Sequence, residues 1–187
     1  SNFFNFFSFK LVRGNSSDVL LGPDKIVLTE SLAERYFGKE DPIGKTMLID
    51  GEFSMKVSGV AANVPVNSQL QFDLVLPVGF LKKRAMDRWR FNIDEAWVGG
   101  WPLTYVQLKD PTGVSEVQKQ INDVVAKHSE KEWKENKMSY YYFLQPIKDI
   151  HLNSNLRYDA RNNGSMARVK IFSILGIDET QQKQRFG

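Results

Sequence analysis

In the first part of the chain, short segments with different patterns of hydrophobic and polar residues follow one another. This arrangement predicts closely spaced strands and helices. Residues 26–28 are a short apolar run that predicts a strand. Thr29 follows as a helix N-cap candidate, and Glu30 places a negative charge in the first turn, where the helix dipole favours it. Apolar residues at helical spacing continue to Gly38, a typical C-terminal stop. The pattern predicts a strand that leads directly into a capped helix.

The pattern then becomes strand-like. Residues 46–49 and 53–60 predict two strands of a hairpin around Asp50-Gly51, a favoured two-residue turn. Residues 72–76 predict a further strand after a polar loop.

The opening of the chain is unusually aromatic. Phe7, Phe9 and Leu11 alternate with polar neighbours, which predicts a strand entered from an apolar lead-in.

The second half is organised around one long helix. A helix begins near Pro77, and residues 104–108 predict a strand. Apolar residues from Val114 onward form one helical stripe that continues toward Trp133. A strand is expected near residues 140–144, so residues 104–144 form a βαβ-like unit.

Composition indicates an ordinary globular domain, with 42% hydrophobic and 25% charged residues. The net charge of +3 comes from 25 basic and 22 acidic residues and is too scattered to indicate a nucleic-acid partner. No cysteine is present, which excludes disulfides, thiolate metal sites and cysteine nucleophiles. No window approaches the roughly 20 apolar residues of a transmembrane helix.

Residues 44–46, Gly-Lys-Thr, look superficially like a phosphate-binding loop. The preceding glycine, Gly38, is one residue too far away, and Glu40 and Asp41 would repel phosphates. A helix precedes the segment and a strand follows it, so no helix N-terminus points at an anion. We interpret the segment as a turn and expect no nucleotide or other cofactor here.

The sequence also gives little indication of a metal site, a serine nucleophile or an acid–base pair. His128 and His151 are the only histidines, and His151 with Asp149 supplies two metal ligands without a third. No serine lies in a nucleophile-elbow motif, and the adjacent carboxylates fall in turns where they are solvated. We expect no catalytic and no metal site, with a hydrolase site around His151 as the weakest alternative.

Tryptophans give the one candidate binding surface. Trp89, Trp97 and Trp101 lie close in sequence with Phe91 in a glycine-containing segment. Exposed, they would resemble a platform for a sugar or peptide. The alternative is that they fill the seam between two lobes.

Taken in order, the motifs of the chain resemble the periplasmic core domain of MacB-like ABC transporter permeases, especially the FtsX-type permeases of Bacteroidetes. The resemblance spans nearly the whole chain and rests on short motifs in a fixed order: Leu28-Thr29-Glu30, Tyr36-Phe37-Gly38, Asp41-Pro42-Ile43-Gly44-Lys45, Val57-Ser58-Gly59-Val60, Asn67-Ser68, Phe72-Asp73, Trp101 before Thr104-Tyr105-Val106, and residues 146–152.

This resemblance implies an α+β fold with two lobes and mixed sheets over residues 1–177. It implies a non-catalytic extracytoplasmic domain that transmits ATP-driven conformational change and contacts cargo or envelope partners. The implied partners are an ABC ATPase, a second permease copy and a periplasmic adaptor, with the parent protein in the bacterial inner membrane. A glycan- or solute-binding module using the tryptophans stays the alternative.

The C-terminal end departs from the family pattern. A second transmembrane helix should begin within residues 169–177, but the apolar run stops after about nine residues, short of the roughly 20 required. Residues 178–187 are therefore interpreted as a polar tail foreign to the domain. If the domain lies between two membrane helices, residues 3–9 and 169–172 should lie close together.

Overall fold

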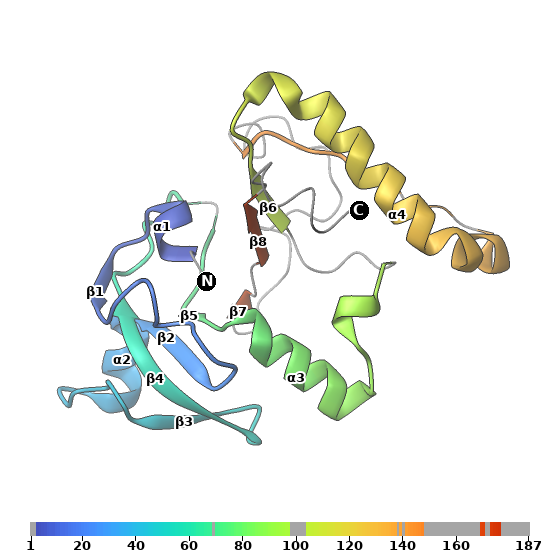
Figure 1. The fold of residues 1–187 in the computed structure, drawn as a ribbon. Coiled ribbons are helices and arrows are strands. Elements are labelled where there is room, and N and C mark those ends of the chain that lie inside the picture. The colour runs from blue at the N-terminus through green and yellow to red at the C-terminus, as the bar shows by residue number, and fades with distance from the viewer. Residues whose placement is uncertain are drawn as a thin grey trace. The chain divides into compact units, whose positions relative to one another are not determined.

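The structure, a computed structural model, describes residues 3–68, 70–97, 104–137, 139, 141–147, 169–170 and 173–176 (Figure 1). The chain divides into two compact units. Unit 1 comprises Ser1–Ile93 with Leu156–Ile174, and unit 2 comprises Asp94–Asn155 with Leu175–Gly187. The combination of helices with a mixed sheet confirms the expected α+β class.

Unit 1 is built on a mixed six-stranded sheet in the order β1-β4-β2-β5-β7, with β3 also paired to β4. Its strands are β1 (Leu11–Arg13), β2 (Lys25–Thr29), β3 (Thr46–Ile49), β4 (Phe53–Ala61), β5 (Leu74–Val75) and β7 (Val169–Lys170). The β2–β4 and β5–β7 pairs are parallel and the others antiparallel. Because β4 is nine residues long, β1 pairs with its end while β3 pairs with its beginning.

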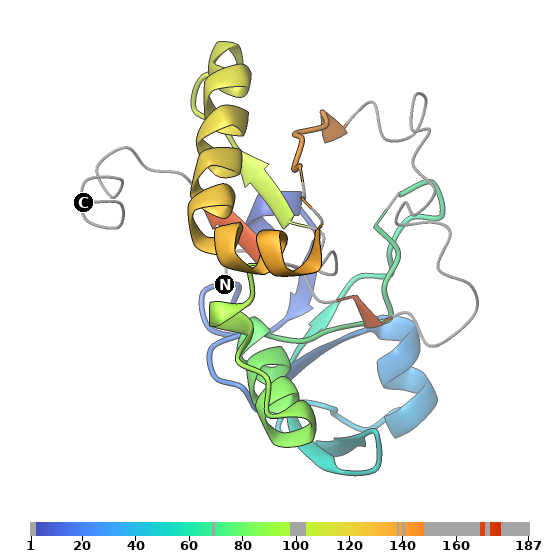
Figure 2. The ribbon, with the colours of Figure 1, turned by 90° about the vertical axis from the view of Figure 1, so that its right-hand side faces the viewer.

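The central strand β2 is buried on both faces. Ile26 and Leu28 point into a core shared with α2 (Glu30–Phe37) and α3 (Val78–Trp89). Val27 lies on the opposite face, where it approaches Val19 beside Gly59. Figure 2 shows the two helices beside the sheet. Burial on both faces explains why β2 reads as a continuous apolar run.

The predicted capped helix is confirmed as α2. The Thr29 hydroxyl accepts a hydrogen bond from the Leu32 amide at 3.4 Å, and Glu30 begins the first turn. The helix ends at Phe37 because Gly38 adopts a positive φ of 60°, and its amide donates to the Glu34 carbonyl.

The predicted hairpin is confirmed with one addition. Asp50 and Gly51 both have positive φ, as the tight hairpin turn requires, and the Glu52 amide donates to the Ile49 carbonyl at 3.1 Å. The strand ladder resumes with Ile49 opposite Phe53, so Glu52 is an extra residue in the connection. That offset leaves Asp50 and Glu52 close together in the turn. The strand predicted at residues 72–76 is shorter than expected, since only β5 forms.

The strand predicted through Phe7 and Phe9 is wrong. Residues Phe3–Phe7 form a short helix, α1, and the strand begins only at Leu11. The reason is packing, because a helical turn lets Phe3 contact Phe7 at a centroid distance of 5.2 Å while it also contacts Phe72 at 5.5 Å. Burial of this ring cluster outweighs the alternating pattern.

Unit 2 is dominated by the predicted long helix, confirmed as α4 (Val114–Asn136). Strand β6 (Thr104–Gln107) precedes it. A two-stranded sheet pairs β6 with β8 (Ser173–Gly176), a strand that contains residues of both units. Two short 3₁₀ turns, η1 (Ile93–Glu95) and η2 (Pro111–Gly113), lie in the connections. The strand expected near residues 140–144 is wrong for the described part of that segment, since residues 141–146 form no strand.

Several expectations fall outside the described residues. They concern Trp101 of the candidate binding surface, Asp149 and His151, and the tail at residues 178–187. Within the part of the chain that is described, no helix combines the length and apolarity needed to cross a bilayer.

Candidate functional site

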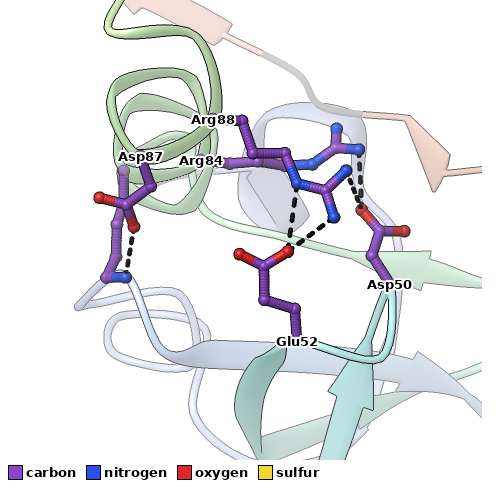
Figure 3. A network of polar contacts seen from close by, with 6 residues as sticks. Asp50, Glu52, Arg84, Asp87 and Arg88 are labelled. Atoms are coloured by element: carbon purple, nitrogen blue, oxygen red, sulfur yellow. Dashed lines mark hydrogen bonds and ion pairs between the residues drawn. The ribbon is translucent and has the colours of Figure 1, made fainter.

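The best-defined polar cluster of unit 1 joins the β3–β4 hairpin to α3 (Figure 3). Arg84 reaches the Asp50 carboxylate with Nη2 2.7 Å from Oδ2. One turn later on the same helix face, Arg88 donates to Glu52 with Nη2 2.7 Å from Oε2, and its Nη1 lies 3.9 Å from Asp50. The hydrogen bond that Arg88 donates to Glu52 is the main reason that the pKa of Arg88 rises above its usual value. Two arginines that are one helical turn apart on α3 thus pair with two carboxylates of the β3–β4 hairpin.

An aromatic contact lies beneath these ion pairs. The buried Phe53 ring, which begins β4, packs edge-on against Phe80 at a centroid distance of 5.3 Å. Lys83 and Arg88 each place a cation 5.5 Å from the Phe53 ring centre. The hairpin therefore contacts α3 through an apolar ring and a charged rim, a combination that fixes the helix against the sheet.

Trp89, the first of the predicted surface residues, lies at the end of α3 and is 54% exposed. The Arg84 guanidinium lies 5.6 Å from its ring centre. Met86 and Phe91 are each 41% exposed and lie within a turn of it. The helix ends here because Arg90 adopts a left-handed conformation with φ 52°. Trp89 therefore belongs to a small exposed apolar patch on unit 1.

Trp97 lies in unit 2 and has a different environment. Its half-buried ring stacks on the imidazole of His128 in α4, with centroids 4.1 Å apart and planes 7° from parallel. The Trp97 carbonyl accepts from the Tyr142 hydroxyl at 3.5 Å. Trp101 lies outside the described residues. Trp89 and Trp97 belong to different units, so the structure does not define one shared tryptophan platform.

The turn at residues 38–45 has the predicted order, with α2 before it and β3 after it. Gly44 has a φ of +82°, and its amide donates to the Val57 carbonyl at 2.8 Å, so this N–H is not free for a phosphate. Lys45 pairs with Glu40, and this bond is the main reason that the pKa of Glu40 lies below its usual value. The residues that suggest a phosphate loop are thus engaged within the protein.

Asp41 joins this turn to strand β1. Its two carboxylate oxygens accept from the Arg13 guanidinium at 2.7 Å each. The Ile43 amide also donates to the carboxylate at 3.0 Å. That backbone hydrogen bond, followed by the one from Arg13, holds the pKa of Asp41 below its usual value.

Metal ligands do not gather in the part of the chain that is described, where no three histidine, aspartate or glutamate side chains form a cluster. His151 and Asp149, the residues considered for a metal or hydrolase site, lie outside the described residues. His128 is engaged in the stack on Trp97.

A polar pair on α4 was not among the residues predicted from the sequence. Asn122 and Gln118 lie one turn apart and bind the backbone of residues 142 and 144. A detectable signal exists, because two amide side chains spaced i, i+4 border the apolar stripe of the helix. Such side chains can hold a neighbouring backbone as a strand would.

Comparison with known proteins gives one family. A family model described as MacB-like periplasmic core domain matches residues 1–124 of the 187-residue chain. No curated protein matches the chain.

Three solved structures are similar at low identity. A domain of a putative permease protein from Porphyromonas gingivalis has 19% identity and a TM-score of 0.45, with 65% of this chain and 55% of that chain covered. The periplasmic region of MacB from Actinobacillus actinomycetemcomitans has 17% identity and a TM-score of 0.42, with 74% of this chain and 63% of that chain covered. The extracellular domain of the noncanonic ABC-type transporter YknZ from Gram-positive bacteria has 15% identity and a TM-score of 0.46, with 78% of this chain and 66% of that chain covered. The chain thus spans less than two thirds of the length of the first two of these chains and 66% of the third. These likenesses are distant, so the family assignment rests on the family model.

Proposed function

The chain belongs to the family of MacB-like periplasmic core domains, and we propose that it is the non-catalytic extracytoplasmic domain of an ABC transporter permease subunit. In this proposal it transmits ATP-driven conformational change and contacts cargo or envelope partners. Its partners are an ABC ATPase, reached through the membrane part of the permease, a second permease copy and a periplasmic adaptor. The parent protein lies in the bacterial inner membrane, with this domain in the periplasm.

The arrangement of unit 1 supports a position between two membrane helices. Phe72 contacts both Phe3 and Phe9, at centroid distances of 5.5 and 5.0 Å. Two residues after Phe72, Leu74 is the ladder partner of Val169. An early and a late segment of the chain therefore both contact the short stretch at residues 72–75. A domain inserted between two membrane helices needs both connections on the same side, as we expected from the sequence.

The attachment of α3 supports a role in transmission. This helix is the last long element of unit 1 before the chain enters unit 2 at Asp94. It is bound to the hairpin by the Phe53–Phe80 contact and by the ion pairs of Arg84 and Arg88. A helix attached in this way moves with the sheet, so displacement of the sheet reaches the connection between the units.

A spectroscopic experiment tests the transmission role in the complete permease with its ATPase in lipid nanodiscs. The 187 residues contain no cysteine, and Val66 is 99% exposed, so Val66→Cys provides a spin-label site in this domain. Pulsed electron resonance would measure the distance between labels in two permease copies. We expect the distance distribution to differ between nucleotide-free and ATP-bound complexes. An unchanged distribution in an ATPase-active complex would reject transmission through this domain.

A glycan- or solute-binding module is the second candidate, and the exposure of Trp89 with Phe91 favours it. Saturable quenching of tryptophan fluorescence by a glycan panel tests it. Trp89→Phe should remove the quenching, whereas Trp97→Phe, in the other unit, is the matched control. Quenching that survives Trp89→Phe would exclude the unit 1 patch as the platform.

A further inference from the structure

Residues 141–145 run alongside α4 and are held by side chains in place of a neighbouring strand. The Asn122 amide group donates to the Tyr142 carbonyl at 2.7 Å and accepts from the Tyr142 amide at 2.8 Å. The Gln118 side chain accepts from the Leu144 amide at 2.9 Å. Binding through residues two apart is the pattern of an extended chain, in which the backbone groups of alternate residues face the same edge.

On the opposite edge of this segment, the described part of the chain provides no hydrogen-bond partner. In an extended chain the N–H and C=O groups of residues 141, 143 and 145 point away from those of residues 142 and 144. Among the described residues, the backbone groups of Tyr141, Phe143 and Gln145 have no hydrogen-bond partner. The segment therefore presents unpaired donors and acceptors in the order of a strand edge.

The side chains of this segment are uncharged, and two of them are exposed aromatic rings. Tyr141 is 69% exposed and Phe143 is 52% exposed, whereas Tyr142 and Leu144 are half-buried. Residues 141–147 contain no charged side chain. Natural proteins commonly protect an exposed edge with a charged residue, a proline or a bulge. Pro146 gives little protection here, because its missing N–H falls on the inner side with residues 142 and 144.

We propose that this edge pairs with the same edge of a second copy of the chain. An antiparallel two-fold arrangement centred on Phe143 lets each Phe143 exchange N–H···O=C bonds with its twin, while Tyr141 faces Gln145 of the other copy. The two Phe143 rings then become cross-strand neighbours, which is a favourable pair on a sheet. The absence of charge on residues 141–147 means that no repulsion opposes the pairing of identical edges.

This inference gives a surface to the second permease copy of the proposed function. It is nevertheless tested on the 187-residue chain in solution, without membrane, ATPase or nucleotide. A negative result here leaves the transmission experiment unaffected, and a failed transmission experiment leaves the pairing of the edge unaffected.

Sedimentation velocity over a concentration series up to about 1 mM tests the association, because weak small interfaces have dissociation constants near this value. We expect the wild-type chain to form a reversible dimer. Phe143→Pro removes the outward N–H without breaking an internal bond, and it should raise the dissociation constant at least about tenfold. Phe143→Lys adds the protecting charge and should have the same effect. Phe91→Lys is the matched control, since Phe91 is an exposed phenylalanine of unit 1, and it should dimerise like the wild type.

Amide hydrogen exchange gives a second readout that a merely structural role would not produce. The Tyr142 and Leu144 amides should be protected at every protein concentration, because Asn122 and Gln118 bind them. The amides of residues 141, 143 and 145 should become protected only as the concentration rises. The proposal is overturned by a wild type that stays monomeric, or by Phe143→Pro and Phe143→Lys chains that dimerise as tightly as the wild type. Protection of the Phe143 amide only by an added unrelated peptide would assign the edge to a different partner and equally reject pairing between copies.

Discussion

The guanidinium of Arg88 in α3 donates two hydrogen bonds to one carboxylate oxygen of Glu52 in the β3–β4 hairpin, from Nη2 at 2.7 Å and from Nε at 3.3 Å. The two residues are 36 positions apart in sequence. Glu52 is the extra residue of the hairpin connection, so the offset in the strand ladder brings its carboxylate to the helix. A local feature of the turn thereby sets the attachment of α3 to the sheet.

Arg88→Met should therefore loosen the hairpin more than it destabilises unit 1 as a whole. Both partners are partly exposed, and exposed ion pairs contribute little to global stability. We expect faster amide exchange in residues 50–53 and a smaller loss of melting temperature than Phe53→Ala causes. Phe53→Ala removes a buried ring and should cost about 3–5 kcal/mol.

The control for Arg88→Met is Lys119→Met, which removes an exposed ion pair with Asp123 within α4. It should leave hairpin exchange unchanged. Equal exchange rates in wild type and Arg88→Met would contradict the assigned attachment.

Two glycines with positive φ should respond very differently to alanine. Gly14 has a φ of +94° and Gly51 a φ of +72°, so each alanine pays the left-handed penalty of about 1–2 kcal/mol. A Cβ at Gly14 would also lie 2.7 Å from a Val19 methyl and 2.8 Å from the Ser58 carbonyl oxygen, whereas nothing lies within 4 Å at Gly51.

We expect Gly14→Ala to lower the free energy of unfolding, measured by urea denaturation, clearly more than Gly51→Ala does. The difference isolates the clash, because the conformational penalty is shared. Similar losses for the two variants would show that the N-terminal turn does not approach β4 as closely as described.

Asp41 should make the protein more sensitive to acid. Its folded-state pKa is depressed below the ordinary value by the Ile43 amide and by Arg13. A depressed carboxyl pKa contributes stability that is complete above the unfolded-state pKa and disappears as the pH falls through the folded-state pKa. The contribution is thus present at neutral pH and begins to decline as the pH falls below about 4, the ordinary pKa of an aspartate.

Asp41→Asn removes this titration, so the difference in melting temperature between wild type and variant should be largest near neutral pH and shrink in acid. Asp18→Asn is the control, because Asp18 forms no ion pair among the described contacts. A difference that stays constant from pH 7 to pH 3 would contradict the role assigned to Asp41.

Local sequence signals predicted much of unit 1. Thr29 and Gly38 define the two ends of α2 because each forms a hydrogen bond with a residue of the helix itself, Thr29 with Leu32 and Gly38 with Glu34. Asp50 and Gly51 define the hairpin because positive φ at both positions is a local requirement. These elements depend on nearest neighbours, which the sequence contains.

The failures depend on distant partners. The opening segment is helical because Phe3 and Phe9 converge on Phe72, which is more than 60 residues away in sequence. The segment at residues 140–144 has the apolar composition of a strand, but its described part binds Asn122 and Gln118 in place of a strand. The candidate tryptophan surface shows the same limit. Although Trp89 and Trp97 are close in sequence, they belong to different units. Trp89 is exposed, whereas Trp97 stacks on His128.

Asn122 offers the sharpest test of unit 2, because one side chain satisfies both backbone groups of Tyr142. Asn122→Ala leaves the N–H and C=O of Tyr142 without their partner, and an unsatisfied part-buried polar group costs about 1–3 kcal/mol. Asn122→Asp keeps an acceptor for the Tyr142 amide but turns a second oxygen toward the Tyr142 carbonyl. We expect both variants to lose amide protection at Tyr142 and Leu144, with Asn122→Ala affecting the Tyr142 amide more because it removes the acceptor.

Asn136→Ala, at the exposed end of the same helix, is the control and should leave the protection of both amides unchanged. Circular dichroism should show an intact α4 in all three variants, since the Asn122 side chain faces the segment at residues 141–145. Protection that persists at Tyr142 in Asn122→Ala would mean that the segment is held by a strand after all. In that case its outer edge would lose the basis on which we propose pairing between two copies.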